Sequence, residues 1–511
     1  MLAKSLSYGL AGINGFQVAV EVNLAFGIPA FDVVGLPDAA VKESRERVRA
    51  ALKNSGMGFP DQRITVNLAP ADLKKEGPAF DLPIALTIMA CMGKIPPEAL
   101  DGTAIIGELS LDGTLRPVRG ALPMVISALE SGVKRVMLPI GNLNEVRCVE
   151  GIELICAESL RAAADHFSGA APIKSVEPVT YESILTGRDT PFDFKNVKGQ
   201  TGAKRALEIA AAGGHNILMI GPPGSGKTLM ARCMPSILPD MTFQESLEVT
   251  RIHSVAGAVP ESGLLAERPF RSPHHTASHA ALVGGGMSAL PGEVSKSHNG
   301  ILFLDELPEY SRDVLEALRQ PLEDGVVTVT RVSAQSTYPA RFMLVCSMNP
   351  CPCGYYGSRQ RECRCSAGEI KRYMSRISGP LLDRIDMHVE VESIAPGELS
   401  SSTASECSAD IRKRVQAARD IQRQRYEPMA GRIKCNSQLD AGTLNAACPM
   451  EKSAKQLLEM SSERLELSNR AYTRILKVAR TIADLDGSNI IKQEHIAEAV
   501  QYRAANRKYW R

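Results

Sequence analysis

The spacing of hydrophobic residues predicts a strand, a helix and a hairpin in the first third of the chain. The stretch FQVAVEVNL alternates with a period of two, which indicates a strand with one buried face, and its apolar side chains are Phe16, Val18, Val20, Val22 and Leu24. A helix rich in Lys and Arg is expected from about Asp38 to Ser55. In LSLDGTLRPV, Asp112-Gly113 separates two short apolar runs, so we expect a hairpin turn there.

The pattern changes after about residue 215 to short apolar runs separated by helical segments. We expect strands in NILMIG, GILFLDE and RFMLVCSMN, and helices in KTLMARCMPSIL and RDVLEALRQPLE. Apolar runs without alternation are typical of parallel strands buried on both faces, so the expected fold class here is α/β. Beyond about residue 410 the pattern is helical, with apolar positions at Ala471, Ile475, Leu476, Ala479, Ile482 and Ala483.

Two linker-like segments divide the chain, at about 169–183 and 394–410, and both are rich in Pro, Ser and small residues. A length of 511 residues is enough for roughly three domains. We therefore expect a first domain at 1–170, a linker at 171–190, an α/β core at 191–394, and a linker with a C-terminal helical domain at 395–511.

Composition and charge limit the class of protein. Hydrophobic residues make up 44% of the chain and charged residues 23%, as in an ordinary folded protein. The formal net charge is only +2, so a polyanion would have to be held by local basic patches. The sequence has no apolar run of the ~18 residues that a membrane span needs, and it has no secretion signal. Twelve cysteines then favour reduced thiols or a metal site, and we expect a cytoplasmic, soluble protein without a membrane partner.

The strongest chemical motif is GPPGSGKT, which fits G-x4-G-K-[ST] directly between a predicted strand and a predicted helix. Its backbone N–H groups and the helix N-terminus would surround phosphate oxygens. Lys227 would reach the β- and γ-phosphates and Thr228 would bind Mg²⁺. The expected ATP-binding residues are Gly221, Pro222, Pro223, Gly224, Ser225, Gly226, Lys227 and Thr228.

Polar residues at the ends of later segments complete a candidate ATPase site. ILFLDE would deliver Asp305 to Mg²⁺ and Glu306 to the attacking water as general base. Asn349 ends the next strand, where its amide could orient that water or sense the γ-phosphate. Arg384 in LLDRID and Arg470 in LSNR could stabilise charge on the transferred phosphoryl group, although a solvated or salt-bridged arginine is the simpler explanation of either one alone.

A cysteine cluster in one short loop is a candidate zinc site. Four thiolates suit tetrahedral Zn²⁺, and the segment CPCGYYGSRQRECRC supplies Cys351, Cys353, Cys363 and Cys365. The C-x-C spacing is tighter than the usual C-x2-C, so four reduced cysteines remain the alternative. Three histidines in SPHHTASHAAL lack a fourth ligand nearby, and we do not expect a second metal site at His274, His275 and His279.

The order of these motifs resembles an AAA+ ATPase. Within that class, NVKGQTGAKRALEIAAAGGHNILMIGPPGSGKT, RPFRSPHHTAS, GILFLDELPEY and MNPCPCG resemble the ComM/YifB family of Mg-chelatase-like proteins over nearly the whole chain. The resemblance implies a P-loop NTPase core with a helical lid, and a ring, expected to be a hexamer, with ATP between subunits. It also implies that Arg384 is a finger acting in trans and that Arg470 is the second sensor in the lid, with Arg474 as the competing sensor candidate.

The resemblance also implies a DNA motor: a helicase or branch-migration translocase that helps to integrate imported DNA in natural transformation. Its partner would be single-stranded or branched DNA, which pore loops at Arg271–Gly286 and around Arg331 would contact. Two alternatives stay open. One is a metal-insertion ATPase of the Mg-chelatase type, whose subunits normally lack the front domain and the cysteine loop. The other is an AAA+ assembly or remodelling factor.

The first domain resembles the proteolytic domain of Lon-type proteases, an α+β fold shared with S5-like domains. That family uses a serine after Gly-Pro and a downstream lysine, whose amine activates the hydroxyl. In KKEGPAFDL the serine position holds Ala79, and in GELSLDGTLRPVRGAL the lysine position holds Leu122. We therefore expect a domain without proteolytic activity that serves as an interaction or ring-stabilising module.

Overall fold

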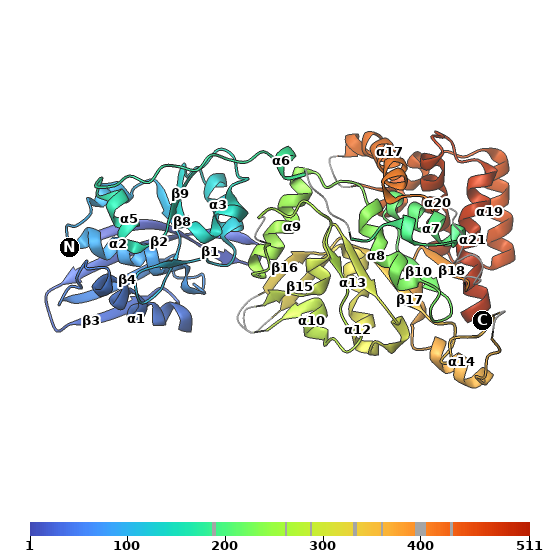
Figure 1. The fold of residues 1–511 in the computed structure, drawn as a ribbon, viewed down its shortest axis with the longest axis horizontal. Coiled ribbons are helices and arrows are strands. Elements are labelled where there is room, and N and C mark those ends of the chain that lie inside the picture. Colours follow the sequence, from blue (N-terminus) through green and yellow to red (C-terminus); the bar gives the residue numbers. More distant parts are fainter. Residues whose placement is uncertain are drawn as a thin grey trace.

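A computed structural model describes residues 1–185, 191–260, 263–286, 289–330, 335–358, 361–393, 405–429 and 433–510. Two lobes lie along the longest axis, with the N-terminal lobe at one end and the C-terminal helices at the other (Figure 1).

The N-terminal lobe is built on a seven-stranded mixed sheet. Its strands, in spatial order, are β3 (Ala30–Val34), β4 (Arg63–Ala69), β2 (Asn14–Ala25), β1 (Leu2–Ala11), β5 (Thr103–Ile105), β8 (Arg135–Pro139) and β9 (Glu153–Ala157). A separate hairpin pairs β6 (Glu108–Leu109) with β7 (Leu115–Arg116). The helices are α1 (Ala39–Asn54), α2 (Asp81–Cys91), α3 (Ala121–Glu130), α4 (Leu143–Val146) and α5 (Leu160–Phe167).

The local patterns explain these elements. Along β2 the side chains of Val18, Val20 and Val22 are fully buried, which confirms the predicted strand. Helix α1 begins after Asp38, whose carboxylate accepts a hydrogen bond from the Val41 N–H, and this cap confirms the predicted start. The predicted hairpin is also confirmed, since β6 and β7 pair in antiparallel fashion across the Asp112-Gly113 turn.

The second lobe contains a five-stranded, all-parallel sheet. Its strands, in spatial order, are β11 (Phe270–Arg271), β14 (Ile301–Leu304), β17 (Met343–Met348), β10 (Ile217–Ile220) and β18 (Met387–Glu390). All residues of β10, β14 and β17 are buried, which confirms the predicted parallel strands covered on both faces.

Helices and short ribbons surround this sheet. A short helix, α6 (Tyr181–Leu185), precedes the lobe. The helices of the lobe are α7 (Thr201–Gly213), α8 (Lys227–Ile237), α9 (Phe243–Val255), α10 (His279–Val283), α11 (Glu293–Lys296), α12 (Arg312–Ala317), α13 (Arg319–Asp324), α14 (Ala367–Met374) and α15 (Gly379–Leu382). The ribbons pair β12 (Gly284–Gly285) with β13 (Leu290–Pro291) and β15 (Val326–Thr330) with β16 (Gln335–Pro339).

The prediction of one continuous helix over RDVLEALRQPLE is wrong, because the segment forms α12 and α13 with a break at Leu318. Pro321 has no N–H to donate to the carbonyl of Ala317, and its ring opposes a continuous helix at that point.

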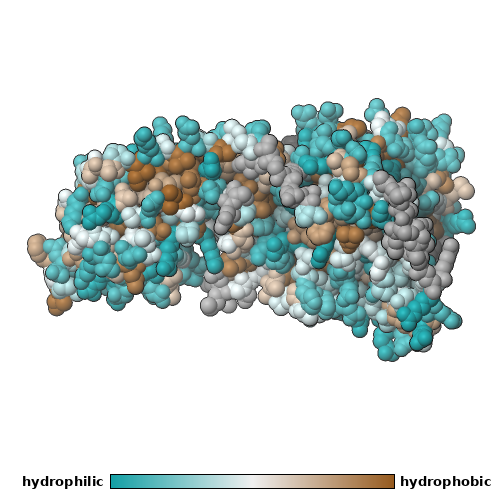
Figure 2. Space-filling view, in the orientation of Figure 1, coloured by the Kyte–Doolittle hydropathy of each residue, from teal (hydrophilic) through white to brown (hydrophobic). Residues whose placement is uncertain are grey.

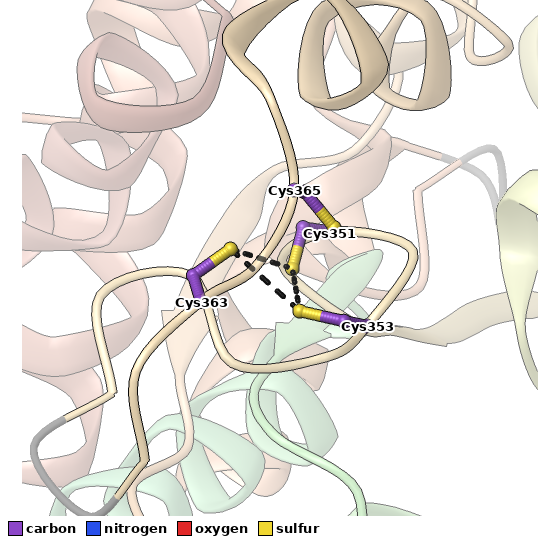
Figure 3. Close-up of side chains that lie close together, drawn as sticks. All are labelled: Cys351, Cys353, Cys363 and Cys365. Atoms are coloured by element: carbon purple, nitrogen blue, oxygen red, sulfur yellow. Dashed lines mark hydrogen bonds between the residues drawn. The ribbon is translucent and has the colours of Figure 1, made fainter.

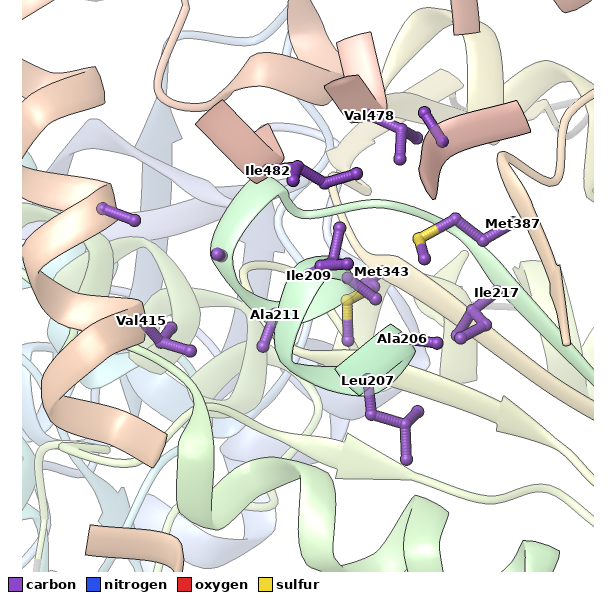
Figure 4. Packing of buried hydrophobic residues seen from close by; sticks show 14 of the residues in the cluster. Ala206, Leu207, Ile209, Ala211, Ile217, Met343, Met387, Val415, Val478 and Ile482 are labelled. Atoms are coloured by element: carbon purple, nitrogen blue, oxygen red, sulfur yellow. The ribbon is translucent and has the colours of Figure 1, made fainter. Parts of the chain in front are cut away.

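The C-terminal region is helical, as predicted, and consists of α17 (Ser408–Tyr426), α18 (Ala441–Ala447), α19 (Lys452–Leu465), α20 (Asn469–Leu485) and α21 (Gln493–Trp510). One apolar cluster joins it to the parallel sheet (Figure 4). In this cluster α7 lies between the sheet and the C-terminal helices, with Ile217 and Met343 on the strands and Val415 and Ile482 on the helices.

The two lobes meet through α3 and α9. The Gly120 N–H donates to the carbonyl of Ser254 at 3.1 Å, and Arg251 lies 3.7 Å from Glu130. Leu264 from the second lobe is buried in the apolar cluster of the first. The lobes are therefore in contact through both polar and apolar groups.

The visible surface is largely hydrophilic, and its larger hydrophobic patches lie on the N-terminal lobe (Figure 2). Among the described residues, each helix is too short or too polar to cross a membrane.

Candidate nucleotide-binding site

The phosphate loop connects the carboxyl end of β10 to the start of α8. Gly224 and Gly226 have φ angles of +77° and +88°, which side chains rarely adopt. At Gly221 a Cβ atom would lie 2.2 Å from the carbonyl oxygen of Val391, so the loop can pass close to the end of β18 only with glycine there. These glycines let the backbone form the turn that GPPGSGKT predicts.

Lys227, the first residue of α8, folds back onto this loop. Its Nζ donates to the carbonyl oxygens of Gly221 at 2.7 Å and Pro222 at 2.9 Å. Burial lowers the pKa of Lys227 to about 8, although Asp305 and Glu306 act in the opposite direction. A partly dehydrated ammonium next to backbone N–H groups provides a strong site for phosphate charge.

Asp305 follows β14 and lies against hydroxyl groups from two other elements. Thr228 Oγ1 donates to Asp305 Oδ2 at 2.8 Å, and the Ser347 hydroxyl of β17 donates to Asp305 Oδ1. Carboxylate and hydroxyl oxygens are the ligands that Mg²⁺ prefers. The two residues that the sequence assigns to Mg²⁺ are therefore in direct contact, and their chemistry fits that ion.

Glu306 lies beside Asp305 in the left-handed region, with φ of +53°. Its side chain is 56% exposed, and its Oε2 lies 4.0 Å from Nδ1 of His275. This carboxylate is thus open to solvent next to the phosphate loop, as a base that activates water requires.

Asn349 follows β17 and reaches the same edge of the sheet. Its Oδ1 lies 3.4 Å from Nζ of Lys227. The structure therefore brings Lys227, Thr228, Asp305 and Asn349 together at the carboxyl ends of β10, β14 and β17. This is the edge where ligands bind in open parallel α/β sheets.

Arg384 and Arg470 lie at the other edge of the sheet, where they line a cavity of about 520 Å³. Asn216, Gly300 and Phe342 line it too, and each directly precedes a strand. Since the strands are parallel, the cavity lies at their amino ends, and a four-residue strand separates the edges by ~13 Å. The structure does not bring Arg384 and Arg470 to the phosphate loop of the same chain.

The Arg384 side chain is 7% exposed and is held by main-chain oxygens. It donates to the carbonyls of Pro380 at 2.7 Å and Arg319 at 3.2 Å, and it pairs with Glu323 at 2.5 Å. Two carbonyl contacts fix the direction of the guanidinium, while the Glu323 side chain is 51% exposed.

Arg470 and Arg474 start α20 on the wall of this cavity. Arg474 pairs with the buried Asp386. Burial opposes ionisation of Asp386, but the charge of Arg474 and the His215 ring, whose Nδ1 lies 3.5 Å away, hold its pKa well below the usual range. Arg474 is thus engaged within the chain, whereas Arg470 is exposed. Of the two sensor candidates, Arg470 is the one that a ligand can reach.

Some residues near the nucleotide site were not predicted from the sequence. Ser347 interrupts the apolar strand MLVCSM and contacts Asp305, and Gln200 donates to the Ser225 carbonyl at 3.2 Å. His275 was considered only as a metal ligand, but it lies beside Glu306. A single polar residue within an apolar strand was the available signal for Ser347.

The predicted pore loops are placed only in part. Half of residues 271–286 are exposed, but Arg271 is paired with Glu293 at 2.6 Å. Arg331 lies outside the described residues.

The cysteine loop lies beside the phosphate loop, and its four sulfurs converge (Figure 3). The sulfur of Cys351 lies 3.4 Å from that of Cys353 and 3.6 Å from that of Cys363. Together with Cys365, all four sulfurs lie within 4.8 Å of one another, and this is the one such group of possible metal ligands in the described part of the chain. With Zn–S bonds of about 2.3 Å, a tetrahedral site has sulfurs about 3.8 Å apart, which is close to the separations among Cys351, Cys353 and Cys363.

In the N-terminal lobe, Ala79 and Leu122 are buried in one apolar cluster with Tyr8 and Leu264. Leu122 lies in the first turn of α3, the helix that contacts the second lobe. The positions that resemble a protease dyad therefore form part of the packing near the contact between the lobes.

Comparisons with known families place the whole chain among Mg-chelatase-like proteins. The family described as "Subunit ChlI of Mg-chelatase" matches residues 20–142. "Magnesium chelatase, subunit ChlI" matches residues 193–399, and its C-terminal counterpart matches residues 405–503.

Individual relatives are similar over nearly the full length. YifB of Escherichia coli (strain K12) is 44% identical over 497 residues, which cover 97% of this chain and 96% of YifB. "Competence protein ComM" of Haemophilus influenzae is 43% identical over 506 residues, 98% of this chain and 97% of ComM. "Lon protease 2" of Bacillus subtilis is 32% identical over 126 residues, 24% of this chain and 22% of that protease.

Proposed function

Because this chain belongs to the Mg-chelatase-like AAA+ family that includes YifB and ComM, we propose that it is an ATP-driven motor acting on DNA. The active form is a hexameric ring in the cytoplasm, working as a helicase or branch-migration translocase during the integration of imported DNA. The observation that carries the ATPase part is the contact of Thr228 with Asp305 beside Lys227 and Asn349 at one edge of the sheet.

The residues of the site have separate roles in ATP hydrolysis. The phosphate loop, residues 221–228, binds the phosphates, and Lys227 exchanges its two carbonyl contacts for phosphate oxygens. Thr228 and Asp305 hold Mg²⁺, which neutralises phosphate charge when bound. Glu306 takes the proton of the attacking water, and Asn349 orients that water.

A ring explains why the arginines lie at the far edge. Arg384 and Arg470 lie at the amino ends of the strands, away from the phosphate loop of their own chain. A neighbouring subunit can present its phosphate loop to the cavity edge, and Arg384 then stabilises the charge of the neighbour's γ-phosphate in trans. Arg470, which is exposed on the same wall, acts there as the second sensor.

The assignment of DNA as substrate rests on similarity to ComM, a protein named for competence, at 43% identity. A net charge of +2 agrees with binding through local loops rather than through a wholly basic surface. Residues 272–286 follow β11, and His275 in this segment lies beside Glu306, so contact with a DNA backbone there could reach the site of hydrolysis.

The cysteine cluster is proposed to hold one structural Zn²⁺. Three of its sulfurs, those of Cys351, Cys353 and Cys363, lie 3.4–3.6 Å apart, and Cys365 Sγ lies within 4.8 Å of each of them, which supports four thiolate ligands around one ion.

ATP hydrolysis measured with single-stranded, duplex and forked DNA tests this function. We expect single-stranded or forked DNA to stimulate turnover several-fold, because ATP hydrolysis is coupled to movement along DNA. A rate unchanged by every DNA, but raised by a porphyrin-binding partner protein, would instead establish the metal-insertion alternative.

A further inference from the structure

We infer that the zinc centre stabilises the conformation of the phosphate loop, so that metal occupancy controls the affinity of the chain for nucleotide. This inference rests on the ATPase proposed above. It concerns the cysteine loop, residues 351–358 and 361–365, which contacts three other parts of the lobe.

The first contact is with the phosphate loop itself. Gly354 has a φ of +85°, and a Cβ at this position would lie 2.6 Å from Cδ of Pro223. The backbone of the cysteine loop therefore packs directly on GPPGSGKT. Its position is fixed from within by the Gly354 N–H, which donates to the carbonyl of Cys351 at 3.0 Å.

The second connection is covalent, because the cysteine loop closely follows Asn349 in the chain. Cys351 is separated by one residue from Asn349, whose amide oxygen lies near the ammonium of Lys227. Cys351 is fully buried, and its sulfur accepts a hydrogen bond from the Tyr356 N–H at 3.3 Å. A fixed position for Cys351 therefore limits how far Asn349 can move.

The third contact is with the last helix. Tyr356 packs edge-on against Tyr509 of α21, with ring centroids 6.3 Å apart. The neighbouring Trp510 donates through its indole N–H to the carbonyl of Met374 in α14 at 3.3 Å. The cysteine loop thus links the phosphate loop to the C-terminal helix.

A metal is needed because the loop has little else to order it. Its sequence is rich in Arg and Gly, and a short loop of this kind buries little apolar surface. Cys353, Cys363 and Cys365 remain partly exposed, so packing does not hold them. Four thiolate–zinc bonds tie the two ends of the loop together, and metal binding of this kind is coupled directly to local folding.

Removal of the metal tests whether zinc occupancy controls the affinity for nucleotide. We expect about one Zn²⁺ per chain in full-length protein purified without chelator. Substituting both Cys363→Ser and Cys365→Ser should remove it and weaken binding of a fluorescent ADP analogue about tenfold or more. Cys407→Ser is the matched control, since Cys407 lies outside the cluster and precedes α17, where serine also caps a helix well.

Two glycine substitutions test the packing contact between the cysteine loop and the phosphate loop without changing the four cysteines. Gly354→Ala retains the four cysteines but drives a methyl group into Pro223, so zinc should stay near one per chain while ADP-analogue affinity falls about tenfold. Gly357→Ala is the control. Gly357 also has positive φ, at +74°, but its Cβ would meet only the flexible end of Lys508 at 3.5 Å.

Three results would overturn the inference: no zinc in the wild-type protein, unchanged nucleotide affinity after metal loss, or equal affinities for the two glycine variants. None of these readouts uses DNA. A wild-type protein that binds the ADP analogue but ignores DNA would therefore contradict the proposed motor and leave this inference standing. A wild-type protein that does not bind the analogue would contradict the proposed ATPase.

Discussion

Replacing Glu306 with glutamine is expected to lower ATP turnover by about 10²–10⁴-fold while ATP binding stays close to wild type. The amide keeps the shape of the side chain at its position beside Asp305, but it cannot accept the proton of the attacking water. Lys227 and Thr228, the residues proposed to bind phosphate and Mg²⁺, are left intact. Steady-state hydrolysis and equilibrium nucleotide binding, measured on the same preparation, separate the two effects.

Glu309→Gln is the matched control for this variant. Glu309 lies three residues further on, and its carboxylate pairs with Arg376 at 2.9 Å on the surface. It should hydrolyse ATP at nearly the wild-type rate. If Glu306→Gln also hydrolysed ATP at that rate, Glu306 could not be the base.

Replacing Arg384 with alanine is expected to lower turnover by about 10³-fold without preventing nucleotide binding. Its side chain lies at the amino edge of the parallel sheet, away from the phosphate loop of its own chain. The loss should therefore appear at the interface with a neighbour. Arg423→Ala provides the control, because Arg423 is an exposed arginine on α17 that pairs with Asp420 at 3.3 Å.

Mixing the two inactive proteins tests the trans assignment. In a mixed ring of Glu306→Gln and Arg384→Ala subunits, some interfaces combine an intact Glu306 from one subunit with an intact Arg384 from the next. Partial hydrolysis should return in proportion to such interfaces. If subunits exchange but no mixing ratio restores hydrolysis, Arg384 acts within its own chain or has only a structural role.

The sequence indicated which residues meet at the carboxyl edge of the sheet, because these residues directly follow apolar runs. Asp305 follows ILFL and Asn349 follows MLVCSM, and parallel strands bring both to the phosphate loop. The convergence of the four cysteine sulfurs was also predictable, since all belong to one short loop.

The placement of the arginines could not be predicted from the motifs alone. Arg384 precedes β18, so it lies at the amino edge, but the strand MHVE was not predicted and this signal was missed. Arg470 reaches the same cavity only through packing of α20 on α7, which joins residues far apart in the sequence. The order of the strands likewise depends on tertiary packing, whereas the break at Leu318 has a signal in the sequence, Pro321, that the prediction of one helix overlooked.

The central claim is that ATP hydrolysis at this site drives movement along DNA, and unwinding of a fluorescently labelled forked duplex tests it most directly. We predict that the wild-type protein separates the strands in the presence of ATP and Mg²⁺, whereas Glu306→Gln binds ATP and leaves the fork intact. A wild-type protein that hydrolyses ATP but never separates or migrates the labelled strands, with either fork polarity or with a four-way junction, would contradict the claim.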